Sequence, residues 1–169
     1  MKKLLLFLSL TFVFTSVIFA QTTEVWIVRH AEKDQSNPED KDPNLSDEGR
    51  IRAGDLATYL TKVKFDAAFS TPYKRTHQTL DSLVSKKKVE VKDYSDIKVL
   101  VEDIRKNYAD KTVIISGHSN NVLELIEAFG GKRPKEELTD DDYDYIFHLT
   151  VKDDKARVKM DQYGRPHHL

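Results

Sequence analysis

"VWIVRHAEKD", residues 25–34, is a short apolar run that ends abruptly in Arg29 and His30. Apolar residues rich in β-branched and aromatic side chains are typical of a buried strand. Two basic side chains at the end of such a strand need a reason, because an unpaired charge is costly to bury. The same arrangement recurs in "TVIISGHSNN", residues 112–121, where an apolar run is followed by His118. Two strand ends that each present a histidine indicate a shared site.

Strand-like runs alternate with helical spacing of apolar residues along the chain. Predicted strands cover residues 25–28, 67–70, 89–91 and 112–116. Predicted helices carry the apolar residues of 56–63, 80–83, 97–108 and 122–129. Thr71-Pro72 is interpreted as an N-cap followed by proline at the first helical position. Gly130-Gly131 is expected to end the last helix.

This alternation predicts an α/β fold, a three-layer αβα sandwich whose central sheet is mostly parallel and covered by helices on both faces. Residues 145–151 alternate between apolar and polar side chains, and "KDDK" (152–155) then turns the chain back, which predicts a C-terminal edge hairpin. No repeat or Pro/Gly-rich linker interrupts the pattern. One domain is therefore expected over residues 21–169.

Residues 1–20 have the pattern of a secretory signal peptide. Lys2 and Lys3 precede an apolar run over residues 4–19, and Ala20 supplies a small residue before Gln21. The run is shorter than the roughly 20 residues that a spanning helix prefers, although an uncleaved anchor is the alternative. We expect cleavage after Ala20 and an exported protein, periplasmic or extracellular, without a membrane partner after cleavage.

The composition narrows the function further. Removal of Lys2 and Lys3 leaves 25 of the 27 basic residues against 28 acidic ones, a net charge of about −3. This balance argues against a general nucleic-acid binder, which normally has a basic surface. The chain contains no cysteine, which excludes disulfides and cysteine metal sites. The oligomeric state does not follow from the sequence.

In sheets of this kind, ligands bind beyond the carboxyl ends of the strands. That rule brings Arg29 and His30 together with His118 and with Arg75 of "FSTPYKRTHQT", residues 69–79. Arginine matches phosphate oxygens in fork geometry, and helix N-termini after His118 and Ser70 would add backbone N–H groups. A neutral imidazole can attack phosphorus, and its tautomer is fixed if the other ring nitrogen bonds a backbone carbonyl.

At these residues the chain resembles the histidine phosphatase superfamily, the phosphoglycerate-mutase-like proteins. The family's Arg-His-Gly signature corresponds to Arg29-His30-Ala31, and its second arginine after a Ser-Pro-type turn to Arg75. Its Gly-His-Ser-type turn corresponds to residues 117–119, and "LSDEGRIRA", residues 45–53, is similar to a helix opening common in the family. The resemblance covers nearly all of residues 24–160. It is nearest to the small branch without cap insertions.

The resemblance implies that His30 is the nucleophile and becomes phosphorylated. Arg29, Arg75 and His118 would hold the phosphoryl oxygens, together with Ser119, and water would then hydrolyse the phosphohistidine. The implied substrates are small phosphorylated molecules, phosphate monoesters or related phospho-compounds, and no metal or other cofactor is required. We also expect that the positive neighbours lower the pKa of His30, whereas His118 is most useful protonated.

The chain departs from the family pattern in two places. Ala31 replaces the usual glycine, which should fit if the backbone does not need positive φ. Many relatives also supply a glutamate as proton donor, and this chain has no clean counterpart of it. Asp96 and Glu32 are the candidates, although Asp96 also fits a helix N-terminal charge and Glu32 a structural ion pair. His77 and His148 are expected at the surface.

Two other functions stay open at this point. Without a proton donor, the pocket would be a module that binds phosphate or a phospho-ligand with little turnover. "GHSNN", residues 117–121, also has part of the Gly-x-Ser-x-Gly pattern of serine hydrolases, with Ser119 as nucleophile. The last glycine of that pattern is absent, and no Asp-then-His order follows.

Overall fold

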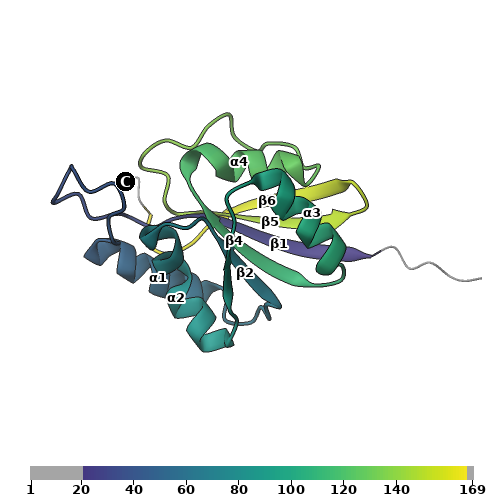
Figure 1. Ribbon diagram of the computed structural model, residues 1–169, viewed down its shortest axis with the longest axis horizontal. Helices are drawn as coiled ribbons and strands as arrows, with labels where there is room; N and C mark the ends of the chain where they lie inside the picture. The colour runs from purple at the N-terminus through teal and green to yellow at the C-terminus, as the bar shows by residue number, and fades with distance from the viewer. Residues whose placement is uncertain (1–20, 167–169) are drawn as a thin grey trace, which may run out of the picture.

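The computed structural model describes residues 21–166, which form one sheet with helices on both of its faces (Figure 1). The strands are β1 Thr22–Arg29, β2 Ala67–Ser70, β3 Val91–Asp93, β4 Thr112–Gly117, β5 Tyr145–Lys152 and β6 Lys155–Gln162. The helices are α1 Asp47–Tyr59, α2 Lys74–Lys87, α3 Ile97–Asn107 and α4 Ser119–Ala128. The predicted signal peptide, residues 1–20, lies outside the described residues. None of the helices within 21–166 is long and apolar enough to cross a membrane.

The strand order across the sheet is β3-β2-β4-β1-β5-β6. The first four strands are parallel, whereas β5 pairs antiparallel with β1 and with β6 to form the predicted edge hairpin. Helices α1 and α2 cover one face, and α3 and α4 cover the other (Figure 1). The predicted three-layer αβα sandwich with a mostly parallel sheet is therefore confirmed.

The register of the sheet brings the key strand ends together. Arg29 at the end of β1 lies opposite Gly117 at the end of β4, and the amide of His30 donates to the Gly117 carbonyl at 2.8 Å. Ser70, the last residue of β2, lies opposite Ser116. The residues that follow β1, β2 and β4 therefore emerge at the same edge of the sheet.

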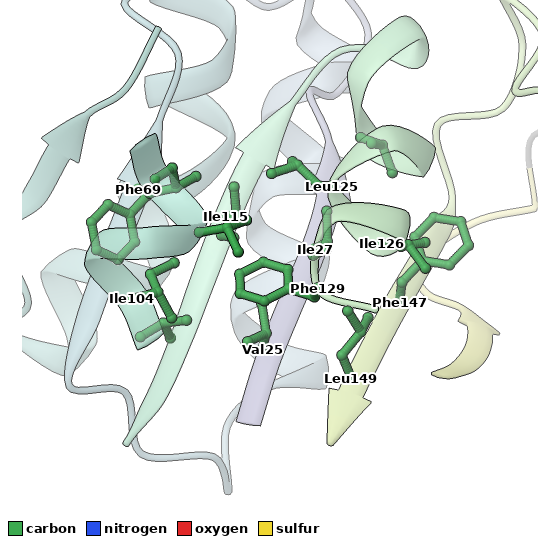
Figure 2. Close-up of a cluster of buried hydrophobic side chains, with 14 of the residues drawn as sticks. Val25, Ile27, Phe69, Ile104, Ile115, Leu125, Ile126, Phe129, Phe147 and Leu149 are labelled. Carbon is green, nitrogen blue, oxygen red and sulfur yellow. The ribbon is translucent and has the colours of Figure 1, made fainter. Parts of the chain in front are cut away.

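Two apolar layers hold this arrangement. Successive residues of β1 point to opposite faces, so Ile27 joins the layer under α3 and α4 while Val28 joins the layer under α1 and α2. Figure 2 shows Ile27 and Ile115 facing Leu125 of α4. Because both faces of the central strands are buried, their sequences are near-continuous apolar runs.

Two predicted boundaries were wrong. Helix α2 begins at Lys74 with Tyr73 as N-cap, not at Thr71-Pro72, because the Thr71 hydroxyl bonds Thr76 and His118 instead. Strand β3 covers Val91–Asp93 and not residues 89–91, because the amide of Val89 still bonds the last turn of α2. The predicted helix around residues 56–63 ends at Tyr59.

The start of α1 is fixed to the segment that follows His30. Ser46 is the N-cap, and its hydroxyl accepts from the Gly49 amide at 3.1 Å while its own amide donates to the Glu32 carbonyl at 2.9 Å. A Cβ on Gly49 would lie 2.1 Å from the Glu32 carbonyl oxygen, so only glycine permits this close approach. The motif at residues 45–53 thus positions the chain beyond the nucleophile candidate.

Candidate active site

A cavity of about 650 Å³ opens at the carboxyl ends of β1, β2 and β4. It brings together six residues singled out from the sequence: Arg29, His30, Glu32, Arg75, His118 and Ser119. The other lining residues are Lys33, Gln35, Tyr73, Asn120, Asp140, Asp141 and Tyr143.

His30 is buried and held in one tautomer. Its Nδ1 lies 2.8 Å from the Ala31 carbonyl oxygen, which can only accept, so Nδ1 carries the proton and Nε2 keeps its lone pair. Burial lowers the pKa of His30 to about 3, and the charges of Arg29, His118 and Arg75 act in the same direction. The lowered pKa was predicted, but burial contributes more than the positive neighbours. His30 is therefore neutral at physiological pH.

Ala31 fits where the family usually has glycine. It is not among the residues with positive φ, and its side chain is fully buried against Leu45 and Ala53. Its amide donates to the Thr79 hydroxyl at 2.9 Å. The position after His30 therefore needs a small side chain and not a left-handed backbone.

His118 is also neutral in the ligand-free site. Its Nδ1 lies 3.5 Å from Arg75 Nη2, which can only donate, and its Nε2 lies 2.9 Å from the Thr71 hydroxyl. The Thr71 hydroxyl donates its hydrogen bond to Thr76 Oγ1, so it accepts the hydrogen bond from His118 Nε2. Burial lowers the pKa of His118 to about 4, helped by Arg75 and Arg29. The expectation that His118 is protonated concerns the site with phosphate bound, and it stays a prediction.

Arg29 is 5% exposed and is anchored by the loop that precedes β5. Its Nη1 donates to the carbonyls of Thr139 at 2.6 Å and Asp140 at 3.1 Å, and its guanidinium carbon lies 4.2 Å from the centre of the Tyr143 ring. The Asp140 carboxylate lies 3.8 Å from its Nη2.

Arg75 is held in a similar way by Tyr73, whose ring centre lies 4.6 Å from the guanidinium carbon, and by Asp42 at 3.8 Å. The Nε atoms of Arg29 and Arg75 are buried and have no hydrogen-bond partner within residues 21–166. A buried donor without an acceptor lowers the stability of the fold, so the placement of the two arginines is better explained by binding of a ligand than by stabilisation of the fold.

Ser119 is the first residue of α4, directly after His118. The amide of His118 donates to Asn121 Oδ1 at 2.7 Å, which fixes the turn into the helix. A Cβ on Gly117 would meet that same oxygen at 2.4 Å, so any other residue there would displace the Asn121 side chain from this hydrogen bond. The first backbone N–H groups of α4 have no acceptor within the helix, and Ser119 and Asn120 line the cavity, so this helix N-terminus can bind an anion there.

The two proton-donor candidates lie in different places. Glu32 lines the cavity, but its Oε1 accepts from Arg52 Nη2 at 2.7 Å and from Nε at 2.8 Å. A carboxylate in this pair is an acceptor and not a donor. Asp96 is the N-cap of α3, accepts from the Val99 amide at 2.9 Å and is not among the residues that line the cavity.

The other histidines lie away from the cavity. His77 is partly exposed and bonds Asp93 at 2.7 Å. His148 is half-buried, because it stacks on Trp26 at 4.0 Å and bonds Glu24 at 2.6 Å. Within residues 21–166, no three His, Asp or Glu side chains gather in a way that could hold a metal ion.

Several lining residues were not singled out from the sequence. Tyr73 lies inside the arginine motif, but nothing in that motif shows that the ring packs against both His118 and Arg75. Asp140, Asp141 and Tyr143 come from the run "TDDDYD", residues 139–144, which indicates only a polar loop. The acidic run just before the predicted edge hairpin was the sequence signal that could have pointed to these lining residues.

A second cavity of about 470 Å³ adjoins the first and shares Glu32, Lys33 and Gln35 with it. The Arg52–Glu32 pair, Ile51 and Arg165 are among its other lining residues. It contains neither histidine of the first cavity, so this groove lies beside the candidate active site and is not part of it.

Comparisons with known proteins agree with this geometry. The family model described as histidine phosphatase superfamily (branch 1) matches residues 25–98. A protein histidine phosphatase, SixA, solved with tungstate, is 17% identical with a TM-score of 0.69, covering 82% of this chain and 96% of that one. A putative α-ribazole-5′-phosphate phosphatase from Escherichia coli is 12% identical with a TM-score of 0.66, covering 83% and 96%.

A mycobacterial glucosyl-3-phosphoglycerate phosphatase, solved with inorganic phosphate, is 13% identical with a TM-score of 0.60, covering 85% of this chain and 98% of that one. Comparison with curated protein sequences gives no match. The structural likenesses establish the fold, and the family model matches the segment that contains both Arg29-His30 and Arg75. Residues 25–98 therefore resemble the histidine phosphatase superfamily in sequence, and the described chain has the fold of solved phosphatases.

Proposed function

We propose that this protein is a phosphatase that hydrolyses phosphate monoesters or related phospho-compounds through a phosphohistidine on His30. One observation carries the proposal: a neutral imidazole, with its proton fixed on Nδ1, lines a cavity together with the buried Arg29, the partly buried Arg75 and a second histidine. The match of residues 25–98 to the histidine phosphatase superfamily supports a phosphatase, although that superfamily also includes mutases. The solved relatives bound to tungstate and to phosphate show that this fold accommodates such anions.

The proposed reaction has two steps. The lone pair on His30 Nε2 attacks phosphorus, the P–O bond to the leaving group breaks, and the leaving oxygen takes up a proton from water or from an acid at the mouth of the cavity. Water then attacks the phosphohistidine, which returns neutral His30 and inorganic phosphate. Arg29, Arg75 and the N-terminus of α4 at Ser119 stabilise the charge on the phosphoryl oxygens.

His118 changes its role when phosphate binds. In the free site its pKa is lowered to about 4, so it is neutral. A phosphate dianion between Arg29 and Arg75 favours the protonated form of His118, because an opposite charge stabilises a nearby cation. The proton then adds a third positive charge to the clamp, and the Thr71 hydroxyl keeps the ring oriented.

The mechanism needs a donor for the proton that the leaving oxygen takes up. Of the two candidates, Glu32 is the one that lines the cavity, and Arg52 occupies its carboxylate. The engaged Glu32 also favours the second candidate function, a module that holds a phospho-ligand with little turnover. Turnover of phosphate monoesters by the purified protein decides between them.

The decisive experiment is a phosphomonoester panel with purified residues 21–169 alongside the His30→Ala protein. Quenching without acid during turnover should trap phosphate on His30 as an acid-labile, base-stable adduct. His30→Ala should abolish both adduct and turnover, whereas His118→Ala should leave slow phosphorylation of His30. Full activity in His30→Ala, or phosphate on Ser119, would refute the mechanism and favour a serine nucleophile.

Export and metal independence belong to the same proposal. The pattern of residues 1–20 supports cleavage after Ala20 and a periplasmic or extracellular enzyme. The cationic side chains supply the charge stabilisation that a metal gives in other phosphatases, so we propose that no metal is needed. If N-terminal sequencing finds Met1 on membrane-bound protein, residues 1–20 are an uncleaved membrane anchor and not a signal peptide for export.

A further inference from the structure

The cavity has opposite charges at its depth and at its mouth. Arg29 is buried and the Arg75 side chain is only 14% exposed, whereas Asp140 and Asp141 line the mouth as exposed residues, and the Asp140 side chain is fully exposed. We call these two aspartates the acidic rim. A pocket built only to attract anions would not place carboxylates at its entrance, because like charges repel the incoming phosphate.

The acidic rim is held in place by contacts behind it. Arg29 binds the Thr139 and Asp140 carbonyls, as described above, and this ties the loop to the end of β1. Next to the rim, the buried Asp142 carboxylate accepts from the Thr139 amide at 2.7 Å and from Lys135 at 3.2 Å. Tyr143 packs against the Arg29 guanidinium. The rim is therefore part of the cavity wall.

Glu32 and Lys33 line the same cavity. Glu32 is neutralised by Arg52, and Lys33 supplies a positive charge. The Asp140 carboxylate lies 3.8 Å from Arg29 Nη2, but its side chain is fully exposed and so stays accessible to a ligand at the mouth. The part of a substrate that extends from the phosphate along the rim therefore meets two carboxylates. A second anionic group at that place is repelled by the rim, and a cationic group is attracted to it.

We infer that the acidic rim selects phosphorylated compounds whose organic part has a cationic group close to the phosphate, such as the phosphate esters of small amino alcohols. Compounds with a second anionic group, such as phosphorylated carboxylic acids, are discriminated against. The inference rests on the proposed function in one respect, that the cavity holds the phosphate of the substrate.

The test compares two ligands of equal length, phosphoethanolamine and phosphoglycolate, by calorimetric titration of the catalytically silent His30→Ala protein. A screened charge contact changes affinity by a factor of about two. Two carboxylates that each attract one ligand and repel the other then favour phosphoethanolamine by roughly tenfold. Asp140→Asn with Asp141→Asn should reduce the preference to about twofold or less.

Asp81→Asn with Glu90→Gln is the matched control, because it makes the same charge change at exposed positions outside the cavity lining. It should leave the preference intact. Equal affinities for the two ligands, tighter phosphoglycolate binding, or a preference that survives the rim substitutions would each overturn the inference. Inorganic phosphate is titrated in parallel. If phosphate binds but the protein does not prefer phosphoethanolamine over phosphoglycolate, only the inference fails. If it does not bind and residues 21–169 release no phosphate, the proposed function fails and the inference fails with it.

Discussion

The neutral state of His30 has a consequence for folding that is measurable without any substrate. In the native protein, burial and the positive charges of Arg29, His118 and Arg75 lower the pKa of His30 to about 3. In the unfolded chain the same imidazole has an ordinary pKa of about 6.5. Between these two values the unfolded state binds a proton that the native state refuses, so stability falls as the pH falls.

The size of the effect follows from the two pKa values. Between pH 7 and pH 5 the unfolded histidine takes up most of one proton while native His30 takes up almost none, which lowers the free energy of unfolding by about 2 kcal/mol. The full difference, reached below pH 3, is about 5 kcal/mol. Above pH 6.5 both states are neutral at this residue and the contribution is absent.

Urea unfolding of residues 21–169 and of its His30→Ala variant, at pH 7 and pH 5 in phosphate-free buffer, measures this term. The wild-type protein should lose about 2 kcal/mol more than the variant between the two pH values. His118 and every other titrating group contribute to both proteins, so most of their effect cancels in the difference. Equal losses in the two proteins would refute the reasoning, since they would mean that native His30 accepts a proton in this range.

Three further predictions concern the site. Thr71→Val should lower kcat/KM roughly tenfold with little change in fold, because His118 loses the acceptor for its Nε2 proton; circular dichroism separates this from unfolding. Aryl phosphates should be hydrolysed much faster than alkyl phosphates; if Glu32 is the proton donor, Glu32→Gln loses alkyl activity by roughly 10²-fold or more and aryl activity less, whereas equal losses remove it from that role. Activity should survive chelators and be inhibited by vanadate; loss with chelator and recovery with a divalent metal would point to another mechanism.

The parts of the site that follow strands could be predicted because their placement is a local property. Arg29, His30 and His118 stand directly after apolar runs, and parallel pairing of β1 with β4 places them side by side whatever the loops do. The hairpin follows from side-chain alternation, and the burial of both faces of the sheet follows from the near-continuous apolar runs of its central strands. These features depend on neighbours in sequence and on the standard geometry of a sheet.

The parts that could not be predicted depend on contacts between distant residues. Arg29 binds the Thr139 carbonyl across 110 positions in the chain, and no local pattern shows that this loop closes the cavity. Thr71 was expected to cap a helix, but its hydroxyl serves His118, which lies 47 positions away. A local preference gives way when a tertiary contact satisfies the same group.

The acidic rim and the occupied Glu32 bear on the same chemical problem. Arg52 engages the Glu32 carboxylate, so Glu32 is held as an acceptor and is poorly placed to protonate a leaving alkoxide. A substrate with an ammonium group near its ester oxygen reduces that difficulty, because the positive charge stabilises the departing oxygen and the group carries protons of its own. Asp140 and Asp141 would hold that ammonium group at the mouth while Arg29 and Arg75 hold the phosphate. In this arrangement the substrate supplies the assistance that a catalytic glutamate gives elsewhere, and an enzyme without that glutamate gains by selecting cationic substrates.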